Sequence, residues 1–337
     1  MAADPIPTEV YDTYWRFAAE RMATYHRRLR DPVGPWTQDP ILRAYRFTNA
    51  YRAADRVSQY LIRHVQYRDD RPQAPGEVFF RTLLFKIFNK IETWERIETA
   101  FGPVSWQSID LNRVSKLLEE ATYRGARIYS AAYIMPSPNF GHARKHDNHL
   151  ALLGRMMDEG LPGRLARARS LEESYGAILA FPGLGPFLAF QYAIDLNYST
   201  LTDFPEGDFV VAGPGALDGL SKCFADPRGL SAEDLIYRMV DRQEREFGRL
   251  GLEFDYLFGR RLQPIDCQNI FCEISKYARV KHPDVAGVAG RTRIKQGYRP
   301  VSRLPEPPMF PPKWGLEVPE MEISATDFPV AAQGQLL

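Results

Sequence analysis

The stretch of sequence that decides the fold is residues 178–189, which read ILAFPGLGPFLA. The pattern predicts a helix that ends near Ala180, a tight Pro-Gly-Leu-Gly turn, and a second helix with Pro186 at its first position, where proline is favoured. Of the two glycines, Gly183 and Gly185, one permits a left-handed backbone and the other lets an anion approach main-chain N–H groups. These N–H groups would lie at a helix N-terminus, which favours a phosphate. We therefore interpret the stretch as a helix-hairpin-helix element that binds a DNA phosphate. A plain corner between two helices is the alternative.

Outward from this element, apolar residues recur at helical spacing along most of the chain. The sequence predicts a first helix that ends before Asp31 and Pro32, a second helix over 41–64, and a buried helix over 78–88. Residues 127–135 fit either a short strand or the end of a buried helix. Further helices are expected at 109–124, 147–157, 163–180, 186–197, 215–224, 231–248 and 266–279. The predicted fold class is all-α, predominantly helical, with few or no strands.

The helices are expected to form one domain over residues 1–303, with the helix-hairpin-helix element at about 178–198. We expect two helical lobes in it, with the functional site between them. From Leu304 onward, seven prolines occur in 34 residues. This density predicts a proline-rich C-terminal tail over 304–337 that is extended on the surface or disordered.

Composition is that of an ordinary globular protein, with 45% apolar and 25% charged residues. No apolar run approaches the roughly 18 residues of a membrane span, and the N-terminus lacks the basic and apolar regions of a secretory signal. We therefore expect a cytoplasmic protein without a membrane partner. The three cysteines show no zinc spacing, and His142, His146 and His149 lack the pattern of a zinc-binding helix. No metal, cofactor or obligate protein partner is predicted.

The net charge is only +1, but phosphate binding needs no more than a local basic surface. Residues 276–303 carry eight Lys or Arg against one acid, Asp284. Such a run is often simply a solvent-exposed face. We interpret it as a DNA contact only because the hairpin independently indicates DNA. The residues of this run that we expect on DNA are Lys276, Arg279, Lys281, Arg291, Arg293 and Lys295.

A second glycine-rich turn, with Gly213 and Gly215, opens a helix that carries Lys222. It could hold another phosphate, and a structural turn fits the pattern equally well.

Polar and aromatic residues suggest a pocket for a base. Arg46, Asn49 and Arg52 follow one another at three-residue spacing, which places them on one face of a helix. Asn can read the hydrogen-bonding edge of a base, and aromatic rings can stack on a base that has left the double helix. Because Arg46 and Arg52 would share this face and are positively charged, we expect both to contact DNA. For each polar residue taken singly, a satisfied core or surface position is the alternative. The expected base pocket consists of Tyr45, Phe47, Asn49, Asn89, Asn269 and Glu273.

The hairpin resembles the helix-hairpin-helix motif of the DNA glycosylase superfamily, which includes endonuclease III and the alkyladenine and oxoguanine excision enzymes. The resemblance implies a catalytic Asp roughly twenty residues after the hairpin, and Asp208 lies 23 residues after Gly185. A carboxylate there can stabilise the positive charge on the sugar as the base leaves. Asp203 and Glu206 could take that role, and Asp208 could instead be a helix N-cap. Family members that also cut the strand carry a Lys just after the hairpin. Residues 186–188 of this chain are Pro, Phe and Leu, so the Lys is missing and the resemblance implies base removal without strand cleavage.

Four blocks of sequence within residues 10–285, at 40–56, 84–94, 209–216 and 271–277, carry a narrower resemblance. They are similar to DNA base hypermodification proteins, a branch named for an α-glutamyl or putrescinyl thymine pyrophosphorylase activity. That branch is related to a phage-defence glycosylase that removes glucosylated hydroxymethylcytosine. The resemblance implies a hypermodified pyrimidine in phage DNA as the substrate.

Together these features predict a monofunctional DNA glycosylase that flips out and excises a bulky modified pyrimidine from double-stranded phage DNA, in defence against phage. Asp208 would be its catalytic residue and DNA its partner. The first alternative is a transferase that attaches an amine or amino acid to activated 5-hydroxymethyluracil in DNA. The second is a DNA-binding module without chemistry.

Overall fold

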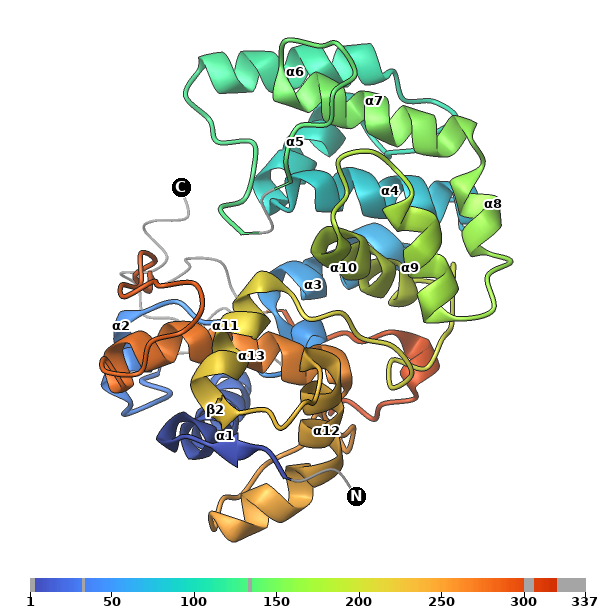
Figure 1. Ribbon diagram of the computed structural model, residues 1–337. Coiled ribbons are helices and arrows are strands. Elements are labelled where there is room, and N and C mark those ends of the chain that lie inside the picture. Colours follow the sequence, from blue (N-terminus) through green and yellow to red (C-terminus); the bar gives the residue numbers. More distant parts are fainter. Residues whose placement is uncertain (1–3, 32–33, 133–134, 300–305, 320–337) are drawn as a thin grey trace. The chain divides into compact units, whose positions relative to one another are not determined.

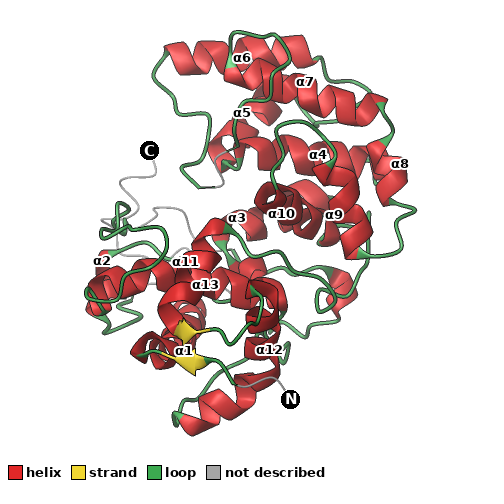
Figure 2. Ribbon diagram, viewed as in Figure 1, coloured by secondary structure: helices red, strands yellow, loops and turns green. Residues whose placement is uncertain are grey.

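The computed structural model describes residues 4–31, 34–132, 135–299 and 306–319. These residues form thirteen α-helices and one two-stranded antiparallel sheet (Figure 1). Figure 2 shows how small the strand content is. The predicted helical fold class is thereby confirmed. The chain divides into two units: unit 1 is Met1–Asp55, Ala212–Met309 and Gly315–Leu337, and unit 2 is Arg56–Val211 and Phe310–Trp314.

Unit 1 is organised around one long C-terminal helix, α13, which packs against α1, α11 and α12. Figure 1 shows α11 alongside α13. The short strands β1 and β2 pair antiparallel, and Thr8 caps α1 by accepting from the N–H of Val10. The elements of unit 1 are β1 (Ile6–Pro7), α1 (Glu9–Arg30), α2 (Pro40–Ala44), the 3₁₀-helix η1 (Arg52–Ala54), α11 (Pro214–Cys223), β2 (Phe224–Asp226), α12 (Ala232–Arg249) and α13 (Pro264–Lys281).

Glycines bring α11 and α13 into close contact. A Cβ on Gly219 would lie 2.1 Å from the carbonyl oxygen of Phe271, and a Cβ on Gly215 would lie 3.1 Å from Sγ of Cys272. Only a residue without a side chain fits at Gly219, because the opposing atom belongs to the backbone. The contact buries Ser275 of α13, which bonds Asp218 and Lys222 of α11.

Unit 2 has its core around α4 and α10. Every residue from Glu77 to Phe88 is buried, as is every residue from Leu188 to Asn197. Burial of that much aromatic and aliphatic surface is the main stabilising term of this unit. The elements of unit 2 are α3 (Arg56–Tyr60), the π-helix η2 (Leu61–Gln66), α4 (Pro75–Phe88), α5 (Ile91–Phe101), α6 (Leu111–Tyr123), α7 (Lys145–Asp158), α8 (Leu161–Leu165), α9 (Leu171–Leu179), α10 (Pro186–Asn197) and the 3₁₀-helix η3 (Pro312–Trp314).

Part of the proline-rich C-terminal segment packs on unit 2. The ring of Trp314 meets Tyr198 edge-on at 5.6 Å between centroids. Nζ of Lys313 donates to the carbonyl oxygen of Ser199 at 2.8 Å. Residues 310–314 are thus part of unit 2, with Phe310 and Pro311 buried, while residues 320–337 lie outside the described residues. The domain boundary at residue 303 stays a prediction.

The predicted elements differ from the structure at four places. The single helix over 41–64 is wrong, because the chain there forms α2, an extended segment, η1, α3 and η2 in turn. The helix over 163–180 is split into α8 and α9, since the side chain of Ser170 caps a new helix start at Leu171. Helix α5 was not predicted. Residues 127–132 and 135 form loop and turn, neither strand nor helix.

No helix among the described residues is long and apolar enough to cross a membrane. In the same part of the chain, no three His, Cys, Asp or Glu side chains lie close enough together to hold a metal ion.

Candidate nucleic-acid interface

One face of α13 holds the extended segment 46–52 by its backbone. The carboxylate of Glu273 accepts from the N–H of Thr48 at 3.0 Å, and that of Asp266 accepts from the N–H of Arg52 at 2.9 Å. Between them, Nδ2 of Asn269 donates to the carbonyl oxygen of Asn49 at 2.7 Å. The three α13 side chains follow at spacings of three and four residues and therefore share a face.

These bonds explain why the predicted helical face does not form. The N–H groups of Thr48 and Arg52 and the carbonyl of Asn49 bond side chains of α13 rather than a helix of their own, so Arg46, Asn49 and Arg52 do not align on one helical face. Arg46 is exposed, whereas Asn49 and Arg52 are buried. The amides of Asn49 and Asn269 bond main-chain groups, and Asn269 also accepts from Oγ1 of Thr48. Both amides are therefore satisfied by hydrogen bonds within the protein. This is the structural alternative to a base pocket that the sequence left open for each polar residue.

Aromatic and charged groups border this segment. The ring of Phe47 is half-buried against Phe17 and Tyr277. Nζ of Lys276 lies 5.4 Å from the Phe47 centroid and 2.6 Å from Oε2 of Glu273. Phe47, Glu273 and Lys276, which the sequence placed at the interface, are therefore brought together in unit 1.

A second extended segment runs antiparallel to the first. The N–H of Arg46 donates to the carbonyl oxygen of Gln296 at 3.1 Å, the N–H of Tyr298 donates to that of Ala44 at 2.9 Å, and Tyr45 forms a bridge with Gly297. This pairing brings Arg46 beside the exposed basic residues of 291–299. We define the basic strip as Arg46, Arg291, Arg293, Lys295 and Arg299.

The basic strip is not neutralised by the fold. All five side chains are exposed, and no carboxylate among the described residues pairs with any of them. Lys281 is exposed as well, at the end of α13. A local excess of positive charge without counter-ions is the electrostatic requirement for contact with a phosphate backbone.

A buried cluster anchors the loop that precedes the strip. The carboxylate of Asp218 accepts from Oγ of Ser275 at 2.5 Å and from the N–H of Ala289 at 2.7 Å. Nζ of Lys222 lies 3.4 Å from the same carboxylate. Burial opposes charge on Asp218, but these bonds and Lys222 outweigh it and lower the pKa of the carboxyl group. Arg279 donates to the carbonyl oxygen of Arg293 at 3.1 Å and so ties the strip to α13.

Several residues predicted on DNA are thus structural. Lys222 is 1% exposed and donates to the carbonyl oxygen of Ser275, so it cannot reach a phosphate. Gly215 packs on Cys272 and makes room for α13, not for an anion. Gly213 is the N-cap of α11. Arg279 is partly buried between Ser275 and Arg293.

The hairpin of unit 2 begins and ends where the sequence predicted, with α9 ending at Leu179 and α10 starting at Pro186. Gly183 has a φ of +81°, and a Cβ there would lie 2.8 Å from Cβ of Pro138. Gly185 is the N-cap of α10, and a Cβ on it would meet nothing within 4 Å. Gly183 therefore serves the turn and the packing of Pro138, while Gly185 leaves the N-terminus of α10 approachable.

Two other predicted site residues lie in unit 2. Asn89 ends α4 with a φ of +48° and accepts from Nζ of Lys86 at 2.7 Å, which is a buried structural role. Asp208 is exposed in the turn after Pro205 and does not cap a helix, because α11 starts only at Pro214. The N-cap alternative for Asp208 is therefore wrong.

Comparison with known proteins identifies the family. The family model of the helical domain of 5-hmdU DNA kinase matches residues 8–287. The chain belongs to this family. It is also 26% identical over 286 residues to the "5-hmdU DNA kinase" of Bacillus phage SP10, an alignment that covers 80% of the chain and 45% of the phage protein. The chain thus spans less than half the length of that curated relative. No solved structure is significantly similar.

The family match corrects the predicted identity and activity. The chain is matched to the helical domain of a kinase and not to a DNA glycosylase, so the predicted base excision, its hydrolase class and its place in phage defence are wrong. The reason for proposing Asp208 as a catalytic residue falls with them. The first alternative, a transferase acting on 5-hydroxymethyluracil in DNA, agrees better with the family match. A kinase is a transferase, and the family name carries the same base. The family name also implies a DNA substrate, which agrees with the predicted partner.

Proposed function

We propose that this chain acts in the phosphorylation of 5-hydroxymethyldeoxyuridine in DNA, as the part that binds the DNA and presents the modified base. The observation that carries the proposal is the family match over residues 8–287. The exposed basic strip of unit 1 supports it, because a DNA kinase must hold a polyanionic substrate.

The reaction joins the hydroxymethyl oxygen of the base to the γ-phosphorus of a nucleoside triphosphate. The bond between the γ-phosphorus and the β–γ bridging oxygen breaks, the nucleoside diphosphate leaves, and the hydroxyl proton passes to a base. Phosphoryl transfer depends on positioning and on stabilising negative charge. The 337 residues contain no Gly-Lys pair and therefore no P-loop of the G-x-x-x-x-G-K-[ST] type. We place the chain on the DNA side of the reaction because of its exposed basic strip.

On that side, we assign the basic strip to the DNA backbone and Phe47 to the neighbourhood of the base. The Phe47 ring is partly exposed, and Lys276 beside it is fixed by Glu273. An aromatic face next to a cation can stack on a base that has left the double helix.

The test uses duplexes that are identical except for one 5-hydroxymethyluracil or thymine. Binding is followed by fluorescence anisotropy, and the nucleosides are analysed by mass spectrometry after incubation with ATP and Mg²⁺. We expect tighter binding to the 5-hydroxymethyluracil duplex, with no free base released. A phosphorylated nucleoside would extend the role of the chain to the whole reaction. Equal, weak binding to both duplexes without a phosphorylated product would contradict the proposal.

A further inference from the structure

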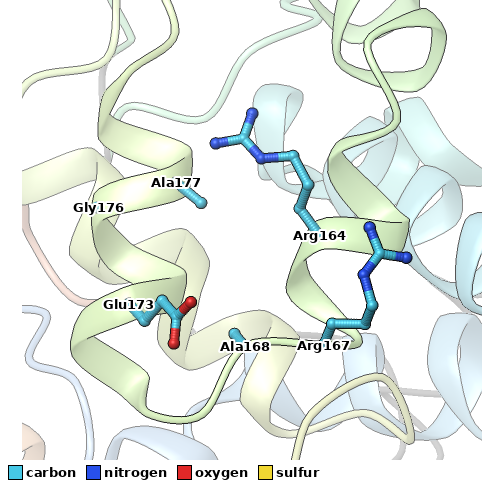
Figure 3. Close-up of a pocket in the computed structure, with 6 residues that line it drawn as sticks. All are labelled: Arg164, Arg167, Ala168, Glu173, Gly176 and Ala177. Atoms are coloured by element: carbon cyan, nitrogen blue, oxygen red, sulfur yellow. The ribbon is translucent and has the colours of Figure 1, made fainter.

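An open pocket lies between α8 and α9 of unit 2, away from the hairpin turn itself. Its volume is about 420 Å³. Figure 3 shows Arg164 and Arg167 on one side and Glu173, Gly176 and Ala177 of α9 on the other, with the guanidinium of Arg164 reaching toward the α9 wall. None of these residues belongs to the basic strip.

The arginines of the pocket lack a carboxylate partner in the described part of the chain, whereas its glutamate is paired. Arg164 and Arg167 are exposed, and no carboxylate among the described residues pairs with them. The carboxylate of Glu173 is instead taken by Arg169, which donates from its backbone N–H at 2.9 Å and from Nε at 3.3 Å. The guanidinium of Arg164 therefore faces the opening without a carboxylate partner from the described residues, while that of Arg167 lies beside Gly163 of α8, at the edge of the pocket. The acid at the rim is largely neutralised.

The opposite wall of the pocket, formed by α9, leaves room for a phosphate to approach its backbone. A Cβ on Gly176 would meet nothing within 4 Å, so the space in front of α9 is free. Guanidinium groups bind phosphate oxygens through paired, charge-assisted hydrogen bonds. Gly176 lies one helical turn, about 6 Å, before Ala180, where the hairpin begins. A chain of phosphates could thus pass from the hairpin to the pocket along α9.

We propose that the pocket between α8 and α9 binds a phosphate group through Arg164, with Arg167 as a second cation at its edge. The phosphate belongs either to the DNA backbone or to a nucleotide, and the DNA case rests on the proposed function. The pocket would be a second point of phosphate contact, in unit 2, besides the basic strip of unit 1.

The test measures binding of three probes to the full chain: the 5-hydroxymethyluracil duplex, ATP and inorganic phosphate. In one variant, Arg164→Gln is combined with Arg167→Gln, and in another Gly176→Leu fills the pocket from the open side. Both should weaken binding of at least one probe by about tenfold. Glu173→Gln should strengthen it, because it removes an acid from the rim and releases the guanidinium of Arg169 that the carboxylate now holds. The matched control Arg127→Gln, an exposed arginine of the same unit, should change binding less than about twofold.

The probes separate the two sources of phosphate. Weakened binding of the duplex alone assigns the pocket to the DNA backbone, and weakened binding of ATP assigns it to a nucleotide. If the variants bind all three probes as the unaltered chain does, or if Arg127→Gln causes the same loss, the pocket assignment is wrong. Failure of the unaltered chain to bind the duplex would instead contradict the proposed function.

Discussion

His149 shows how a buried titratable residue can hold a loop at the hairpin. Its Nε2 donates to the carbonyl oxygen of Pro136 at 2.9 Å, and its Nδ1 accepts from the hydroxyl of Tyr129 at 2.8 Å. Both bonds are satisfied by the neutral ring. Pro138, two residues after Pro136, packs against Gly183. A single imidazole therefore fixes the segment that supports the turn.

This arrangement predicts a loss of stability in mild acid. Burial lowers the pKa of His149 to about 4, from an ordinary value near 6.5. Between these values the unfolded chain binds the proton more readily, so stability is complete above about pH 6.5 and falls as the pH approaches 4. The full loss amounts to about 3 kcal/mol. Urea denaturation at a series of pH values measures it.

The variant His149→Gln should flatten this dependence on pH. It should not remove it entirely, because burial also lowers the pKa of His146. The control His142→Gln, which replaces an exposed histidine just before α7, should leave the dependence unchanged. An unaltered slope in His149→Gln would show that another group causes the acid sensitivity.

At the scale of single elements, the close packing of α11 against α13 depends on a glycine, and this dependence can be tested. Gly219 faces the carbonyl oxygen of Phe271 at a distance that no Cβ can tolerate. Gly219→Ala should destabilise the fold by about 3 kcal/mol, because the two helices must separate. The matched control is Gly176→Ala, since Gly176 is also helical but faces open space, and it should stabilise the fold by about 0.5–1 kcal/mol. Thermal unfolding of both variants gives the comparison, and equal effects would contradict it.

The same scale shows what local sequence can predict. Helices that are apolar over most of their length and begin at a proline, such as α4 and α10, lie close to their predicted positions. The segment 46–52 has a helical pattern, but its N–H groups bond carboxylates of α13, more than 200 residues further along the chain. No local pattern contains these partners. Tertiary hydrogen bonds overrode the spacing that had placed Asn49 in a base pocket.

At the scale of the whole molecule, the candidate site was predictable in its charge but not in its chemistry. The excess of Lys and Arg after residue 276 is visible in the sequence, and the structure leaves most of it exposed. The hairpin was also correctly located as a turn between two helices, but a turn of this kind does not specify a reaction. The assumed catalytic carboxylate came from the resemblance to glycosylases, and the family match removed the reason for assigning it.

A global electrostatic prediction follows from the basic strip. If each side chain contacts one phosphate, binding to DNA releases counter-ions, and each lost contact reduces the slope of log Kobs against log salt by about 0.9. The combined variant Arg291→Gln, Arg293→Gln and Lys295→Gln should therefore lower the slope by about 2–3. Anisotropy titrations with a plain duplex over a range of salt concentrations measure it.

The control must change the net charge equally at another place. Arg228, Arg245 and Arg261 are exposed residues of unit 1, and each already faces a carboxylate, of Asp226, Glu246 and Glu244 respectively. Replacing all three by Gln should leave the salt slope within about 0.5 of its original value, because only contact with phosphate releases counter-ions. Equal losses in both triple variants would mean that DNA responds to the total charge of the chain. A loss confined to the strip would establish a local site on a chain whose net charge is close to zero.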